Sequence, residues 1–98
     1  MTTVAAGDSA CLHAVVTGLV QGVSFRYYTQ RRAEELGLAG WVRNRRDGSV
    51  EVTAEGGREL LLELAEFLRK GPPYAEVTDL QLSWHEPTGE FNAFDVRY

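Results

Sequence analysis

The stretch GLVQGVSFRYY, residues 18–28, combines two glycines four positions apart with Arg26 at the start of a predicted helix. Glycines at 18 and 22 permit backbone angles closed to other residues, so successive amides can turn inward and form a concave anion site. The N-terminal amides and dipole of the helix add to this site. The planar, permanently charged guanidinium of Arg26 can hold two phosphate oxygens at once. The pattern predicts a phosphate-binding loop that consists of Val20, Gln21, Gly22, Val23, Ser24, Phe25 and Arg26.

Two nucleotide-binding motifs do not fit this loop. No Gly-Lys-Ser/Thr triplet follows it, as a P-loop requires, and the glycine spacing is not that of a dinucleotide-binding fingerprint. A Gly-x-x-x-Gly segment followed by arginine is weak evidence by itself and, taken alone, favours a plain turn with an exposed arginine. The pattern alone leaves both interpretations open.

Hydrophobic spacing and turn residues predict the elements that hold the loop. A run without breakers predicts a strand over residues 10–17, and apolar residues at helical spacing from Phe25 onward predict a helix. Ser24 is the expected N-cap of that helix and Gly37 its stop. A hairpin around an Asp-Gly turn, a second helix and two further extended segments follow at residues 40–46, 49–56, 58–70, 75–86 and 91–98.

This order matches the α+β arrangement called ferredoxin-like, a split βαβ unit (βαββαβ) with a short additional C-terminal strand and two helices on one sheet face. Residues 1–9 are expected to form a flexible tail and residues 10–98 a single domain. In such a topology the first two strands run parallel, so their carboxyl ends emerge at the same edge of the sheet. Asn44 lies near the end of the second strand and is therefore expected beside the loop.

Charge and cysteine content exclude several classes of function. The 98-residue chain has 14 acidic and 10 basic residues, which disfavours a protein that binds many nucleic-acid phosphates. Residues 18–46 contain six arginines and only two glutamates. These arginines either attract anions or only face water, and no role is assigned to Arg43, Arg45 and Arg46.

The single Cys11, predicted to be buried, excludes an intrachain disulfide and a cysteine zinc cluster. The absence of a basic leader and of a long apolar run predicts a cytoplasmic protein that does not bind membranes.

Several other side chains could carry chemistry but are better explained structurally. Capping explains Ser24 without a nucleophilic role, because no Ser/His/Asp arrangement is suggested. Aromatic and acidic residues on the helices and strands are expected to pack or to face solvent. The residues given such structural roles are His13, Tyr27, Tyr28, Trp41, Glu59, Glu63, Glu66, Trp84 and His85. On the helix predicted over residues 58–70, one broad apolar face consists of Leu60, Leu61, Leu64, Phe67 and Leu68.

The blocks VQGVSFR, LGLAGWVRN, DGSVEVTAEG and the closing VRY, in this order and at this spacing, resemble the acylphosphatase family from about residue 12 to the C-terminus. The resemblance implies a ferredoxin-like fold and metal-independent hydrolysis of the carboxyl-phosphate bond of small acyl phosphates. It also implies one essential arginine and one essential asparagine, which match Arg26 and Asn44. Without Arg26 in this context, Asn44 would be interpreted as a turn residue that bonds local backbone.

The expected reaction gives a carboxylate and inorganic phosphate. Arg26 and the loop amides would hold the phosphoryl group, and Asn44 would position the attacking water. We expect a monomer that needs no cofactor or metal and has no nucleic-acid partner. The alternative is a non-catalytic regulatory module that binds phosphate or carbamoyl phosphate in the same loop. Asn44 favours the enzyme, because a pure binding loop does not need a residue that positions water.

Overall fold

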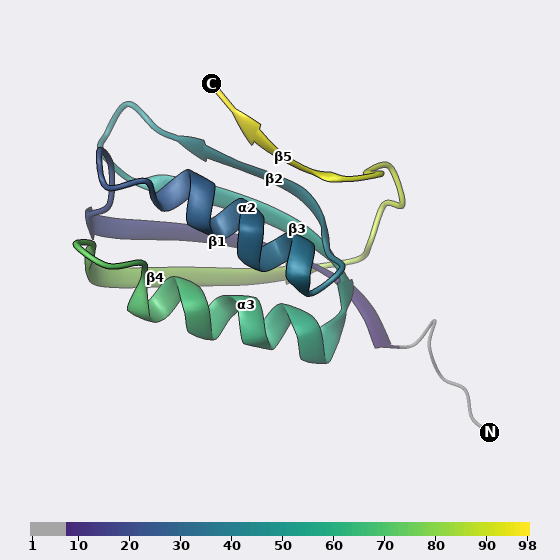
Figure 1. Cartoon of the computed structure of the whole chain (residues 1–98). Helices are drawn as coiled ribbons and strands as arrows, with labels where there is room; N and C mark the ends of the chain where they lie inside the picture. The colour runs from purple at the N-terminus through teal and green to yellow at the C-terminus, as the bar shows by residue number, and fades with distance from the viewer. Residues whose placement is uncertain (1–7) are drawn as a thin grey trace.

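The computed structural model describes residues 8–98, which form one mixed sheet covered by two helices on a single face (Figure 1). The predicted tail lies mostly outside the described residues, and the first strand begins at Ser9. The predicted order of elements and the ferredoxin-like arrangement are confirmed. The bounds are β1 (Ser9–Leu19), α2 (Phe25–Glu35), β2 (Ala39–Asn44), β3 (Val50–Gly57), α3 (Arg58–Lys70), β4 (Glu76–His85) and β5 (Phe94–Arg97).

The strands lie in the order β4-β1-β3-β2-β5. Both β1 and β2 pair with β3 in antiparallel fashion, so β1 and β2 run parallel to each other. Val50 of β3 lies opposite Val16 of β1 on one side and Asn44 of β2 on the other. The carboxyl ends of β1 and β2 therefore meet at one edge of the sheet, as predicted. Strand β5 extends the sheet beside β2 in the parallel direction.

The core lies between the sheet and the helices, because alternate strand residues and one stripe of each helix are apolar. On α3 the buried residues are Leu61, Leu64, Ala65 and Leu68, at the spacing of one helix face. The prediction that Leu60 belongs to this face is wrong. Leu60 is 37% exposed, because it precedes Leu61, the first residue of the buried stripe, and therefore lies beside the stripe on the helix surface.

Gly18 has a different role from the one predicted. It belongs to β1 and lies at a register shift in the pairing of β1 with β4, with a φ of 131°. A Cβ atom at this position would collide with the carbonyl oxygen of Glu76. Gly18 is therefore the glycine of a β-bulge, where another backbone approaches closely, and not part of the anion-binding loop.

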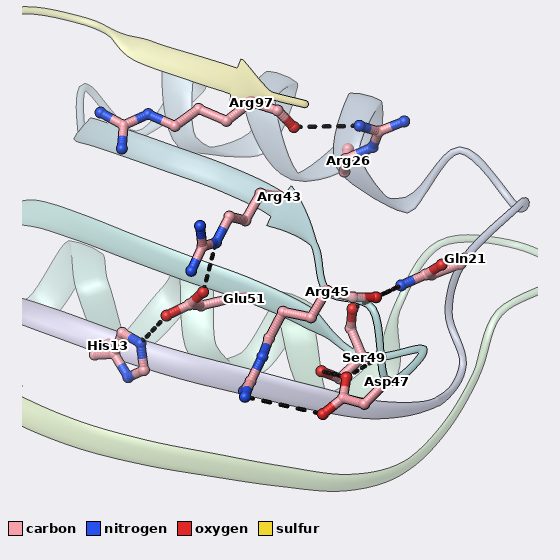
Figure 2. A network of polar contacts seen from close by, with 9 residues as sticks. All are labelled: His13, Gln21, Arg26, Arg43, Arg45, Asp47, Ser49, Glu51 and Arg97. Atoms are coloured by element: carbon pink, nitrogen blue, oxygen red, sulfur yellow. Dashed lines mark hydrogen bonds and ion pairs between the residues drawn. The ribbon is translucent and has the colours of Figure 1, made fainter.

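The sheet face without helices carries a network of polar and aromatic side chains. Glu51 accepts hydrogen bonds from Arg43 Nε and His13 Nε2, and each of the two bonds is 2.7 Å long (Figure 2). Burial acts to raise the pKa of the Glu51 carboxyl, but the bonds from His13 and Arg43 outweigh it and hold the pKa below its usual value. Trp41 lies on the same face, and the guanidinium groups of Arg43 and Arg97 both lie over its ring. His13 and Trp41 thus have the structural roles expected of them.

Residues away from this network also bear on the sequence predictions. Cys11 is buried and the three acidic residues of α3 are exposed, as predicted. Trp84 is less buried than predicted, with 36% of its surface exposed and Arg58 over its ring. His85 contacts the hydroxyl of Ser83. Within residues 8–98, neither helix has the length and apolar character needed to cross a bilayer.

Candidate active site

The loop between β1 and α2 has the backbone of an anion-binding nest. Gly22 has a φ of 79° and Ser24 a φ of 62°, whereas φ of the intervening Val23 is not positive. This alternation of sign turns successive amide N–H groups toward a common point. Among residues 8–98, the amides of residues 22–26 have no backbone or side-chain acceptor. These amides are therefore available to bind an anion at the positive end of the α2 dipole.

The prediction that the Ser24 side chain caps α2 is wrong. Ser24 occupies the N-cap position, but its backbone is left-handed and its hydroxyl makes no capping hydrogen bond. A side-chain cap requires an extended backbone at this position, which the nest does not permit. The helix instead begins with the hydrogen bond from the Tyr28 N–H to the Ser24 carbonyl, 3.1 Å long. The first amides of α2 thus remain unused by the protein.

Arg26 lies in the first turn of α2 and is half-buried against the end of β5. Its Nη1 donates a hydrogen bond to the carbonyl of Arg97 over 3.2 Å (Figure 2). Its Cζ lies 4.6 Å from the centre of the Tyr98 ring. Among the described residues, no carboxylate forms an ion pair with Arg26. The guanidinium is held in place, and its charge is available to an anionic ligand.

Asn44 is the last residue of β2. Strand alternation places it on the same sheet face as the buried Val42, the face that the helices cover. No hydrogen-bond partner for its side-chain amide is found within residues 8–98, local backbone included. Asn44 and Tyr98 line one hollow of about 340 Å³ together with Arg43, Arg45 and Arg46.

Tyr98 connects the two predicted site residues. It contacts the guanidinium of Arg26 and lines the same hollow as Asn44. The register of β2 with β5, in which Arg43 pairs with Arg97, brings the residues that follow these two next to each other at the sheet edge. The structure therefore places Arg26 and Asn44 in one neighbourhood, around the end of β5.

Gln21 fastens the loop to the turn between β2 and β3. Its Nε2 donates to the carbonyl of Arg45 over 2.7 Å and to the carbonyl of Ser49 over 2.9 Å (Figure 2). The turn is itself closed by the bond from the Arg45 N–H to the Ser49 carbonyl and by Asp47, which accepts from Ser49. Sequence reasoning placed Gln21 in the loop but missed this role, although a single two-donor amide between apolar residues was a signal for it.

The three arginines near Asn44 are engaged differently. Arg43 points to the opposite sheet face, where Glu51 binds it, and Arg45 lies 3.9 Å from Asp47. Arg46 is exposed and has no ion-pair partner within the described part of the chain. Arg46 is therefore the one whose charge stays most available beside the hollow. In residues 8–98, no cluster of three or more His, Cys, Asp or Glu side chains could hold a metal ion.

Comparison with known proteins decides the family. The acylphosphatase family model matches residues 12–96, which include the loop, α2 and Asn44. The chain belongs to the acylphosphatase family.

Relatives and solved structures of acylphosphatases agree with this assignment. An acylphosphatase of Acaryochloris marina is 50% identical over 86 residues, which is 88% of this chain and 91% of the relative. Acylphosphatase structures from Bacillus subtilis and Coxiella burnetii are each 38% identical and superpose with a TM-score of 0.88. They cover 91% and 98% of this chain, and 99% and 100% of their own. The overall fold of this chain is thus that of solved acylphosphatases.

Proposed function

We propose that this acylphosphatase hydrolyses small acyl phosphates with Arg26 and Asn44 as its catalytic residues. One observation carries the proposal. Arg26 and Asn44 lie around the same residue, Tyr98, and within residues 8–98 the Arg26 guanidinium has no carboxylate partner and the Asn44 side chain has no hydrogen-bond partner. Next to them, the amides of residues 22–26 have no acceptor within residues 8–98. This arrangement suits a ligand with a phosphoryl group and an attacking water.

The phosphoryl group would be held by Arg26 and by the backbone amides of residues 20–26. Preorganised donors of this kind neutralise the charge on the equatorial oxygens and continue to do so as charge redistributes in the transition state. The leaving group is a carboxylate, which departs without a strong general acid. Holding and orienting the phosphoryl group is therefore the main task of the site.

Asn44 would align the attacking water. Its carbonyl oxygen accepts from the water and its amide group donates to the phosphoryl group or to the water oxygen. The water oxygen forms a bond to phosphorus while the bond from phosphorus to the acyl oxygen breaks. The carboxylate leaves with that electron pair. An amide cannot take the proton, so the proton passes to a phosphate oxygen of the substrate, and the second product is inorganic phosphate.

We also propose that the reaction needs no metal ion or cofactor. In many phosphoryl-transfer sites a metal neutralises the phosphate and orients it. Here Arg26 and the positive end of α2 supply both effects from the protein itself. The acidic chain and its single cysteine further support a cytoplasmic monomer without a nucleic-acid or membrane partner.

Steady-state hydrolysis of benzoyl phosphate in the presence of EDTA tests the proposal. Arg26→Ala and Asn44→Ala should each lower kcat by about a hundredfold to a thousandfold, the usual effect of losing one such electrostatic contact. Arg31→Ala and Asn92→Ala are matched controls, because Arg31 binds Tyr27 on the exposed side of α2 and Asn92 is an exposed loop residue. Circular dichroism checks that each variant is folded.

Full turnover in folded Arg26→Ala or Asn44→Ala protein would contradict these roles, and loss of turnover in EDTA alone would contradict metal independence. A wild type that binds inorganic phosphate through Arg26 but hydrolyses no acyl phosphate would favour the non-catalytic module instead.

A further inference from the structure

A second hollow adjoins the phosphate-binding loop, at the connection between α3 and β4. Figure 1 shows this connection, the β1–α2 loop and the β2–β3 turn at the same end of the sheet. The hollow has a volume of about 570 Å³. It is lined by Gly22, Val23, Ser24, Tyr28, Pro73 and Tyr74.

The two hollows at the loop differ in chemistry. The one beside Asn44 is lined by three arginines, whereas none of the charged side chains of residues 8–98 lines the second one. Two aromatic rings, Tyr28 and Tyr74, and the ring of Pro73 line it instead. Its remaining lining residues are those of the nest, so an uncharged surface with two aromatic rings begins where the anion site ends. An acyl phosphate has the same division, since a charged phosphoryl group is joined directly to an uncharged acyl group.

Tyr74 is held in an unfavourable conformation at this place. The N–H of Ala75 donates to the carbonyl of Pro72 over 3.1 Å and closes a tight turn in which Tyr74 is the third residue. Its φ is 74°, where glycine or asparagine is the usual residue of such a turn. Its side chain is 89% exposed, although a large ring gains from burial. A strained backbone that presents an exposed ring beside a binding loop points to a function in binding.

We propose that this hollow binds the acyl group of the substrate, and that Tyr28 and Tyr74 favour acyl phosphates with aromatic or bulky apolar acyl groups. The assignment rests on the proposed function and names the substrate class of the same site. An aromatic acyl group stacks against the exposed rings and removes their apolar surface from water. The methyl group of acetyl phosphate is too small to contact both rings.

The test compares kcat/KM for benzoyl phosphate with kcat/KM for acetyl phosphate. The ratio of the two values should fall about two- to tenfold in Tyr74→Gly and in Tyr28→Ala, the size expected from the loss of one aromatic contact. Glycine is chosen at position 74 because it keeps the positive φ without strain. Tyr74→Phe keeps the ring and should retain the ratio. Leu62→Ala removes an exposed apolar side chain of α3 outside this hollow and should leave both values unchanged.

The possible outcomes are distinct. Hydrolysis of both substrates with an unchanged ratio in Tyr74→Gly and Tyr28→Ala would overturn the assignment of the hollow alone. A wild type that hydrolyses neither substrate would overturn the proposed function, and the assignment with it. A ratio that falls in both variants and is retained in Tyr74→Phe would support the assignment.

Discussion

Arg26 Nη1 donates a hydrogen bond to the backbone carbonyl of Arg97, 71 positions later in the chain. The ring of Tyr98 covers the same guanidinium. Because β5 pairs with β2, these contacts connect the first turn of α2 to the strand that ends at Asn44. A long arginine side chain loses rotamer entropy when it binds a ligand, and contacts that restrain it beforehand reduce that cost. The end of β5 thus restrains Arg26 of the proposed site, although the proposed mechanism takes no reacting group from it.

Tyr98→Ala should therefore weaken catalysis moderately without abolishing it. A cation–π contact at an exposed position contributes about 0.5–1 kcal/mol, so we expect kcat/KM for acetyl phosphate to fall about two- to fivefold. The hydrogen bond from Arg26 to the Arg97 carbonyl remains in this variant. Trp84→Ala removes a comparable contact, with Arg58, far from Arg26, and should not change kcat/KM. Equal values for Tyr98→Ala and the wild type would show that the ring does not restrain Arg26.

Gln21 should act as a positioning residue that sets the loop against the strand of Asn44. Gln21→Leu removes both hydrogen bonds to the β2–β3 turn, while the Arg45 and Ser49 carbonyls each keep a backbone partner. We expect about 1–2 kcal/mol of lost stability and a ten- to hundredfold fall in kcat, because a small misplacement of catalytic groups is costly. The inhibition constant of inorganic phosphate should change little, because the nest and Arg26 remain.

Gln30→Leu is the matched control for Gln21→Leu. Gln30 also donates from Nε2 to a backbone carbonyl, that of Phe94, over 3.0 Å, and it joins α2 to β5 away from the β2–β3 turn. Its loss should lower the stability by a similar amount without the fall in kcat. If both variants lose kcat in proportion to stability, Gln21 has only a structural role.

Local signals in the sequence predicted the fold and the loop that ends at Arg26, whereas the pairing of Arg26 with Asn44 as candidate catalytic residues came from the family resemblance. Hydrophobic periodicity and the Asp-Gly turn gave the order of elements, and the topology then placed Asn44 beside the loop. The same signals could not separate two uses of glycine. Gly18 and Gly22 both have positive φ, but one accommodates a neighbouring strand and the other shapes the nest. The prediction of a Ser24 side-chain cap was wrong for a similar reason. The preference of serine for the N-cap position does not indicate whether the backbone there is left-handed.

The sequence did not predict the contacts of Arg26 and Gln21 or the conformation of Tyr74, because these depend on the packed structure. Arg26 contacts β5, and Gln21 contacts the β2–β3 turn. Both contacts join segments far apart in the chain, so hydrophobic periodicity could not predict them. The role of Tyr74 depends on a turn conformation that a preceding pair of prolines suggests but does not determine. Such features follow from the packed structure and not from local propensity.

The two glycines of the opening motif should respond differently to alanine. Gly18→Ala places a Cβ against the backbone of Glu76 at a positive φ, and we expect a loss of about 3 kcal/mol or more as β1 and β4 are forced apart. At Gly22 a Cβ has no neighbour within 4 Å, so only the backbone conformation is penalised, by about 1–2 kcal/mol.

Urea unfolding and acetyl phosphate hydrolysis of the two variants check this difference. Gly22→Ala should stay folded at 25 °C and lose activity because the nest changes shape, whereas Gly18→Ala should show the larger fall in unfolding free energy. A reversed order of stability would contradict the bulge assignment of Gly18.

Glu55 should make the stability depend on pH. Glu55 is only 8% exposed. Its carboxylate accepts two hydrogen bonds of 2.8 Å from the N–H and the hydroxyl of Thr88, and one of 3.0 Å from the N–H of Gly89. Burial acts to raise the pKa of Glu55, but the bonds from Thr88, Gly89 and the Cys11 thiol outweigh it and hold the pKa below its ordinary value. A carboxyl whose pKa is lowered on folding stabilises the protein above its unfolded pKa of about 4.3, and this stabilisation is lost as the pH falls through the folded value.

Glu55→Gln should accordingly lower the unfolding free energy by about 1–3 kcal/mol at pH 7, because the amide group turns a donor toward N–H groups that need an acceptor. The difference from the wild type should shrink as the pH falls below about 4.3, because the unfolded-state carboxyl of the wild type takes up a proton there and the folded-state carboxyl does so at a lower pH. Urea unfolding at pH 7, 5 and 3 measures both effects, with the exposed Glu86→Gln as the control that should match the wild type throughout. A Glu55→Gln deficit of the same size at all three pH values would mean that shape, and not the charge of Glu55, holds the segment around Thr88 on the sheet.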